Sequence, residues 1–216
     1  MIIRPYGPRD RAAVRRLCCD TADRGEPVEH FFRDREVFAD LITRYYTDYE
    51  PERTWIAEEG GQVIGYLTGC RDTRRYWRVT AWRLLPAAAA RMLLRGTWWH
   101  RQTWVLLWGG AHTWWRGGFR RPLPLDEYPA HFHIDLDQAA RGHHVGQALI
   151  ARFLDQLRAD RVPGVHLVTR DDNTAACRFF QRVGFSLFSR HPMTIPIGTS
   201  WDAHAALVYV LRLAPR

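Results

Sequence analysis

The chain has 216 residues, of which 46% are hydrophobic and 25% charged, a composition typical of a globular protein rather than a disordered segment. Its formal charge of +8 comes from arginine alone, because the sequence contains no lysine, and favours an anionic ligand such as a nucleotide cofactor. We expect no membrane span, no signal peptide and no disulfide framework, and we place the protein in the cytoplasm. We expect residues 1–216 to form a single domain.

The first third of the chain predicts a strand, two amphipathic helices and a β-hairpin. The apolar spacing and the Gly and Pro breakers place them at residues 1–6 (strand), 10–22 and 36–49 (helices), and 54–57 and 63–67 (strands), with the hairpin turn at 59–62.

The composition changes between residues 72 and 126, where arginines alternate with eight of the ten tryptophans. We predict two or three helices inserted between strands of the main sheet. Our structural interpretation is that the tryptophans pack a satellite core. The functional alternatives are a lid over the substrate, a dimer face, or a surface that rests on a membrane. Such a mixture also resembles a platform for single-stranded nucleic acid, although no nucleic-acid motif accompanies it.

Residues 130–136 alternate in the period-2 pattern of a strand. One side carries His131, His133 and Asp135, and the other carries Phe132, Ile134 and Leu136. A central strand covered on both faces would normally be apolar throughout, so the polar side predicts a cleft.

The segment after this strand, residues 141–146, turns sharply into an apolar-periodic helix that continues to Leu157. Unpaired backbone N–H groups and the helix dipole meet at such a turn, which predicts an anion site. The rest of the chain predicts a strand at 165–169, a helix at 173–183 that ends at Gly184, and strands at 185–189 and 205–213.

Two motifs at this spacing resemble the GCN5-related N-acetyltransferase (GNAT) superfamily. Arg141-Gly142-His143-His144-Val145-Gly146 is similar to the family's Q/R-x-x-G-x-G/A, and Asn173, Ala176, Gly184 and Phe185 are similar to its N-x-x-A-x-x-x-Y-x-x-x-G-F. The resemblance implies an α/β fold with a mixed, mostly antiparallel sheet flanked by helices. It covers nearly the whole chain except the Trp-rich helical insertion, which we expect before the central strand. A weaker likeness is to the acetyltransferase-like domain of O-GlcNAcases.

The resemblance also implies acetyl-CoA as cosubstrate. In the family, the pantetheine arm pairs with the backbone of the central strand, here at Ile134 and Leu136, and Asn173 contacts the cofactor arm or caps its own helix. The pyrophosphate would rest on the turn amides, which belong to Arg141, Gly142, His143, His144, Val145 and Gly146.

Two residues depart from the family pattern. His144 stands where glycine is usual, so its side chain must point away from the phosphates. Phe180 replaces the tyrosine that protonates the departing thiolate, and phenylalanine has no proton to give. Loss of this acid should slow the chemistry without forbidding it, because a thiolate is a tolerable leaving group.

The proton of an attacking amine requires an acceptor, and we predict Asp135 and His133 for the acid–base roles, directly or through water. His131 and Glu127 lie further upstream. The alternatives are that His133 and Asp135 form a buried structural hydrogen bond, or that His131, His133 and Asp135 bind zinc. No further metal ligand is apparent in the sequence, so we expect no metal.

The sequence therefore predicts acetyl transfer from acetyl-CoA to an amine of a small molecule or peptide, with no nucleic-acid partner and with homodimerisation left open. One alternative is a catalytically weak or inactive binding module with the same fold, which the departures at Phe180 and His144 would allow. Another is that the Arg- and Trp-rich insertion holds an anionic surface.

Overall fold

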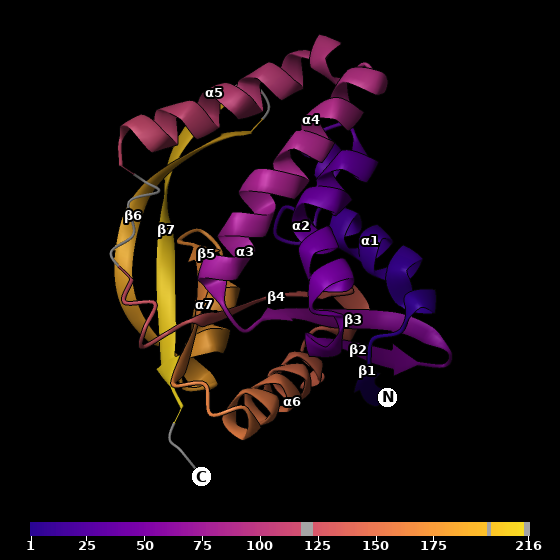
Figure 1. The fold of residues 1–216 in the computed structure, drawn as a ribbon, viewed down its shortest axis with the longest axis vertical. Coiled ribbons are helices and arrows are strands. Elements are labelled where there is room, and N and C mark those ends of the chain that lie inside the picture. The colour runs from indigo at the N-terminus through magenta and orange to yellow at the C-terminus, as the bar shows by residue number, and fades with distance from the viewer. Residues whose placement is uncertain (118–122, 198–199, 214–216) are drawn as a thin grey trace.

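The computed structural model describes residues 1–117, 123–197 and 200–213. A seven-stranded sheet in the order β1-β2-β3-β4-β5-β7-β6 lies at its centre, with helices on both faces (Figure 1). Only β4 and β5 are parallel neighbours within this sheet. The strands are β1 (Ile2–Pro5), β2 (Thr54–Glu59), β3 (Gln62–Cys70), β4 (Ala130–Leu136), β5 (Gly164–Arg170), β6 (Ser186–Ile197) and β7 (Ser200–Arg212). The predicted mixed, mostly antiparallel α/β fold is confirmed.

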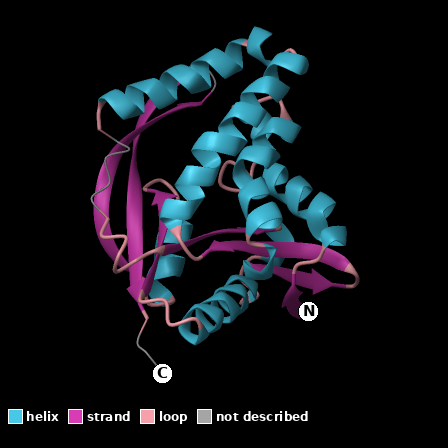
Figure 2. Cartoon of the chain, viewed as in Figure 1, coloured by secondary structure: helices cyan, strands magenta, loops and turns pink. Residues whose placement is uncertain are grey.

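The helices pack around the sheet (Figure 2) and follow one another along the chain in the predicted order. They are α1 (Arg11–Asp20), α2 (Arg35–Tyr49), α3 (Thr73–Val79), α4 (Leu85–Leu94), α5 (Arg101–Trp115), α6 (Val145–Ala159) and α7 (Thr174–Arg182). A π-helical turn at Thr80–Leu84 joins α3 to α4.

The last two strands are longer than predicted. The strand predicted at 185–189 continues to Ile197, and the strand predicted at 205–213 begins at Ser200. Pro192 and Pro196 obscured the first of these strands, because proline normally interrupts a ladder of hydrogen bonds. β6 tolerates both prolines because it is an edge strand with only β7 beside it.

Both faces of the sheet are covered by amphipathic helices. On one face, Leu149 and Phe153 of α6 pack with Leu67 of β3 and Phe132 of β4. On the other face, α1 and α2 cover the strands through a smaller cluster built from Val14, Leu17, Cys18, Ile56 and Tyr66. β4 is therefore held between two helical layers, and these layers position its side chains.

The insertion between β3 and β4 contains α3, α4 and α5, as predicted. Its buried side chains include Ala88, and also Leu84 and Met92, which pack against α2 and the loop before it. The interpretation of the tryptophans as a satellite core is wrong: Trp98 is half-buried, and the other seven in this segment are exposed. Among the described residues, every helix is too short or too polar to span a lipid bilayer.

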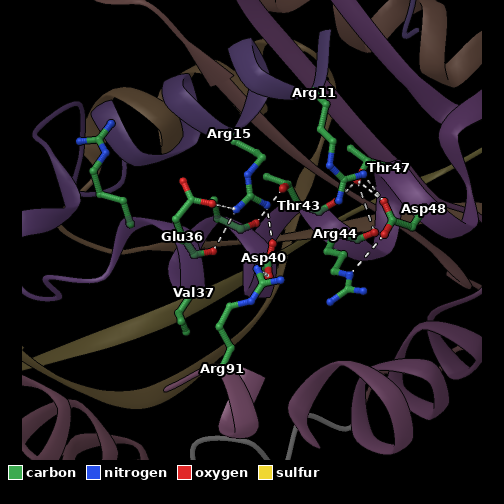
Figure 3. A network of polar contacts seen from close by, with 12 residues as sticks. Arg11, Arg15, Glu36, Val37, Asp40, Thr43, Arg44, Thr47, Asp48 and Arg91 are labelled. Atoms are coloured by element: carbon green, nitrogen blue, oxygen red, sulfur yellow. Dashed lines mark hydrogen bonds and ion pairs between the residues drawn. The ribbon is translucent and has the colours of Figure 1, made fainter. Parts of the chain in front are cut away.

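Charged side chains fasten the insertion to α1 and α2 (Figure 3). Asp40 of α2 accepts hydrogen bonds from Arg15 of α1 and from Arg91 of α4. Asp34, which caps α2 through the backbone N–H of Val37, also accepts from Arg95 Nε at 2.8 Å and from Thr97 Oγ1 at 2.5 Å. The insertion is thus anchored by carboxylates that α2 supplies.

Candidate active site

The centre of the site is a separation between β4 and β5. The two parallel strands pair only at Ala130–Val165 and His131–His166. From Phe132 onward the strands diverge, so the β5-facing backbone groups of β4 have no neighbouring strand to pair with. A cleft of about 770 Å³ opens there, lined by the loop after α1, β4, the turn before α6, β5, α7 and Met193 of β6.

His133 and Asp135 lie side by side on β4, as their two-residue spacing predicts, and both line the cleft. His133 Nε2 donates to Asp135 Oδ2 at 3.0 Å. The hydroxyl of Tyr66, directly opposite Asp135 on β3, donates to the same oxygen. The His133 side chain is 42% exposed and that of Asp135 is 14% exposed, so the histidine is the member of the pair that opens to the cleft.

This pairing fixes the chemistry of the imidazole. Burial alone lowers the pKa of His133, but the charge of Asp135 and the hydrogen bond to it outweigh burial, and the pKa of His133 is raised. Because Nε2–H points at the carboxylate, the lone pair of neutral His133 is on Nδ1. Burial, together with the charge of Asp135, raises the pKa of Tyr66 well above its usual value, so the tyrosine stays protonated and keeps donating.

His131, two residues earlier on the same side of β4, is not part of this pair. Its Nε2 contacts the Tyr46 hydroxyl at 2.9 Å, and its Nδ1 contacts Thr73 Oγ1 at 2.7 Å. Thr73 Oγ1 donates its own proton to the carbonyl of Pro129, so His131 Nδ1 carries a proton and Nε2 accepts from Tyr46. Burial and the neighbouring histidines His166 and His133 lower the pKa of His131 well below its usual value, which keeps it neutral.

The zinc alternative is wrong in this geometry, because both ring nitrogens of His131 are engaged by Thr73 and Tyr46. Among the described residues, three metal-ligand side chains converge elsewhere, at Asp171, Asp172 and His204. Arginine side chains already occupy both of those carboxylates, Arg190 on Asp171 and Arg170 on Asp172. Glu127 pairs with Arg212 and does not line the cleft.

The turn that the sequence predicts as an anion site lines the cleft. His144 is the residue before α6 and has left-handed backbone angles, with φ 60°, and its Nδ1 lies 3.3 Å from Gln147 Oε1. The first N–H groups of α6 have no acceptor within the helix. A Cβ on Gly146 would lie 3.1 Å from Phe179 Cζ and 3.3 Å from Leu136 Cδ1, so the helix needs glycine to approach β4 this closely.

The other predicted cofactor residues divide into two groups. Ile134, Leu136, Arg141, Gly142, His144, Val145, Gly146 and Asn173 line the cleft, whereas His143 is exposed outside it. Asn173 Oδ1 accepts from the Ala176 N–H at 3.1 Å, so the residue caps α7 and also faces the cleft. Phe180 is buried in the cleft wall, with its ring edge-on to Phe132 and Phe185.

Three residues of the site were missed by sequence reasoning. Tyr66 lies in an ordinary apolar strand pattern, and nothing in the sequence connects it to Asp135, 69 positions away. Arg24 and Arg170 line the cleft and share the carboxylates of Asp23 and Asp172. In the sequence, Arg24 is an arginine in a Gly-containing loop and Arg170 is an arginine at the end of a strand. Both patterns are too common to identify a residue as part of a site. The described lining contains four arginines and one carboxylate, which suits an anionic ligand.

The family model described as "Acetyltransferase (GNAT) family" matches residues 22–185, which include β4, the turn before α6 and α7. The chain belongs to this family of N-acetyltransferases. The family resemblance inferred from the two motifs is thereby confirmed.

Individual proteins are similar to parts or all of this chain. A mycothiol acetyltransferase of Brachybacterium faecium is 39% identical over 70 residues, which are 32% of this chain and 21% of that protein, so the chain spans about a fifth of the relative's length. The crystal structure of SsHAT is similar over 99% of this chain and 98% of that one, with 29% identity and a TM-score of 0.72. The yncA protein of Salmonella typhimurium, solved with its cofactor acetyl-CoA, shares the fold at 15% identity and a TM-score of 0.58 over 100% and 95% of the chains.

Proposed function

We propose that the protein transfers an acetyl group from acetyl-CoA to an amine, with residues 1–216 acting as one domain. The observation that carries this proposal is the cleft between β4 and β5, where the His133–Asp135 pair and the N-terminus of α6 line one cavity. Membership of the GNAT family supports acetyl transfer in general. The cosubstrate, the acceptor and the site residues are our proposals.

The residues around the cleft fit acetyl-CoA. The diverging edge of β4 at Ile134 and Leu136 offers backbone groups to the amides of the pantetheine arm. The amides from Arg141 to Gly146 and the α6 dipole face the place where a pyrophosphate would lie. Arg141 adds positive charge there, and Asn173 reaches the same cavity from α7.

Acetyl-CoA supplies a thioester carbonyl, which the amine nitrogen attacks as the C–S bond breaks and the thiolate leaves. His133 Nδ1 is proposed to take the proton that the nitrogen loses. Asp135 holds the imidazole with Nε2–H toward the carboxylate and stabilises the imidazolium that forms, and Tyr66 holds Asp135 in turn. We therefore assign His133 as the base and Asp135 as the residue that positions it.

The departing thiolate finds no proton donor at Phe180. We propose that it leaves as the anion and is protonated by water, which a thiol pKa of about 8.5 permits. The rival function, a binding module without turnover, is favoured by this missing acid. The exposed, carboxylate-paired His133 favours the enzyme, because a purely structural pair would be sealed from the cleft.

Thermal unfolding with and without acetyl-CoA, combined with a thiol-release assay on a panel of amines, tests the proposal. A ligand at a hundredfold excess over its dissociation constant stabilises the folded state by about 2.7 kcal/mol, which raises Tm by about 5–10 °C for a chain of this size. Gly146→Trp should abolish this shift, because even a Cβ at this position lies 3.1 Å from Phe179. A folded wild-type protein without any shift at millimolar acetyl-CoA would refute the proposal. A shift without turnover would identify the binding module.

We propose the cytoplasm as the compartment. Its support is that the four cysteines, Cys18, Cys19, Cys70 and Cys177, are all free thiols. The acceptor class we propose is a small-molecule or peptide amine, since the cleft opens beside His133.

A further inference from the structure

The helix α5 has its apolar and polar faces reversed relative to an ordinary surface helix. Its buried positions are the small or polar residues Thr103, Gly109 and Thr113. Its solvent side carries large apolar residues, which we call the tryptophan face and which are Trp104, Leu107, Trp108, Trp114 and Trp115. Positions 104, 108 and 115 recur at helical spacing, so they form one stripe along the helix.

Buried threonines and exposed large apolar residues also occur elsewhere in the insertion, although α4 buries Ala88 and Met92. Thr73, Thr80 and Thr97 are buried, whereas Leu94 and Trp99, at the junction of α4 and α5, are each 89% exposed. Monomeric proteins rarely leave so many large apolar side chains together in water, and a contiguous patch of this kind marks an interaction surface. Figure 1 shows α5 lying across the far ends of β6 and β7, at the end of the molecule opposite α6.

The charge of this segment indicates the partner. Between Thr73 and Gly117 the sequence has eight arginines and no aspartate or glutamate. Arg74, Arg91 and Arg95 pair with carboxylates outside the segment. Arg101 and Arg116, at the two ends of α5, are exposed and have no carboxylate partner among the described residues. The surface is therefore both apolar and cationic.

We propose that the tryptophan face of α5 docks on the surface of an anionic phospholipid bilayer. A helix that lies in the membrane interface buries an apolar stripe of Trp and Leu and places basic residues against lipid phosphates. Tryptophan suits the boundary between the lipid headgroups and the acyl chains, because its ring is apolar and its N–H can still reach water. Each arginine near an anionic leaflet strengthens binding about fivefold.

Two other occupants fit these observations less well. A second copy in a symmetric dimer would place the same surface against itself, so arginines would face arginines with no carboxylate from this segment between them. Single-stranded nucleic acid could stack on tryptophan and contact arginine. However, it offers no apolar phase for Leu107 of the tryptophan face, which is also exposed.

The test is co-sedimentation of the full chain with vesicles of phosphatidylcholine alone and of phosphatidylcholine with phosphatidylglycerol at a 1:1 ratio. We expect binding to the anionic vesicles that weakens as salt rises, and much weaker binding to neutral vesicles. Trp108→Gln/Trp115→Gln should weaken binding by more than tenfold. A control that removes two exposed apolar residues outside the insertion, Ile2→Gln/Leu187→Gln on β1 and β6, should bind like the wild type.

A second pair of variants tests the charge separately. Arg101→Gln/Arg116→Gln should weaken binding to anionic vesicles by about 30-fold, on the basis of about fivefold per arginine. Arg152→Gln/Arg178→Gln, which removes two exposed arginines from α6 and α7, should leave binding unchanged. The four substituted arginines are exposed, so we expect both double variants to fold like the wild type. Thermal unfolding checks that they do.

Four results would overturn the proposal. The first two are that the wild type does not bind anionic vesicles, or that it binds neutral vesicles equally well. The third is that the wild type sediments with the mass of two chains and Trp108→Gln/Trp115→Gln with the mass of one. The fourth is that the wild type prefers a single-stranded oligonucleotide to vesicles and that the same variant abolishes this binding. None of these results bears on acetyl transfer, because the described lining of the cleft includes no residue of α5.

Discussion

Replacing Asp135 by Asn tests the proposed acid–base pair most directly. The change keeps the size of the side chain and leaves an oxygen that can still accept from the Tyr66 hydroxyl. It removes the charge that His133 Nε2 faces at 3.0 Å. A hydrogen bond to a charged group contributes about 1.5–3 kcal/mol. Because His133 is 42% exposed, we take the lower half of this range, which corresponds to a loss in kcat of about 10- to 40-fold.

The same substitution has a predictable effect on the pH dependence. The carboxylate is the cause of the raised pKa of His133, and burial alone lowers it. The base is active only when neutral, so kcat/KM of the wild type should fall as pH drops through the raised pKa. In Asp135→Asn this acid limb should move to lower pH. The interaction between protonated His133 and Asp135 also stabilises the folded state. This contribution to the free energy of unfolding is fully present below the pKa of about 6.5 that His133 has in the unfolded chain, and it is lost as pH rises through the raised pKa of the folded protein.

Steady-state assays of thiol release from pH 5 to 9, on wild type and Asp135→Asn, measure both effects. Glu127→Gln is the matched control, because Glu127 is an exposed carboxylate outside the cleft. An Asp135→Asn protein with unchanged kcat, or with an acid limb at the wild-type pH, would refute the assignment. A lower kcat combined with an unmoved acid limb would show that Asp135 acts on something other than the His133 proton.

Three further predictions concern other parts of the molecule. His144→Gly should raise Tm by about 2–4 °C, because glycine removes about 1 kcal/mol of strain from a left-handed position; a lower Tm would contradict this. Asp34→Ala should lower the free energy of unfolding by about 3 kcal/mol, because the α2 cap and the buried hydrogen bond from Thr97 are both lost. Asp34→Asn can still cap the helix and should lose less, so equal losses in urea unfolding would argue against the cap. Phe180→Tyr should raise kcat by up to about tenfold by restoring an acid beside the cleft, and unchanged thiol release would show that thiolate departure does not limit turnover.

Much of the fold follows from local patterns in the sequence. The period-2 alternation of β4 places His133 and Asp135 on one side, because successive side chains of a strand point to opposite faces. The helices α6 and α7 can likewise be predicted from the apolar periodicity of neighbouring residues. The same holds for the turn into α6, which Gly146 marks in the sequence. The turn before α6 and the order of the elements were predictable for this reason.

The tertiary structure alone decided which side chains meet. Tyr66 lies opposite Asp135 only because β3 pairs with β4 in that register, and His131 is held away from the pair by Tyr46 of α2 and Thr73 of α3. β6 could extend through its prolines because it is an edge strand, which no local pattern reveals. The tryptophans were predicted to be buried on their hydrophobicity, and they are exposed because α5 turns its threonines and glycines toward the protein. Burial depends on what packs against a helix, and that is a non-local property of the chain.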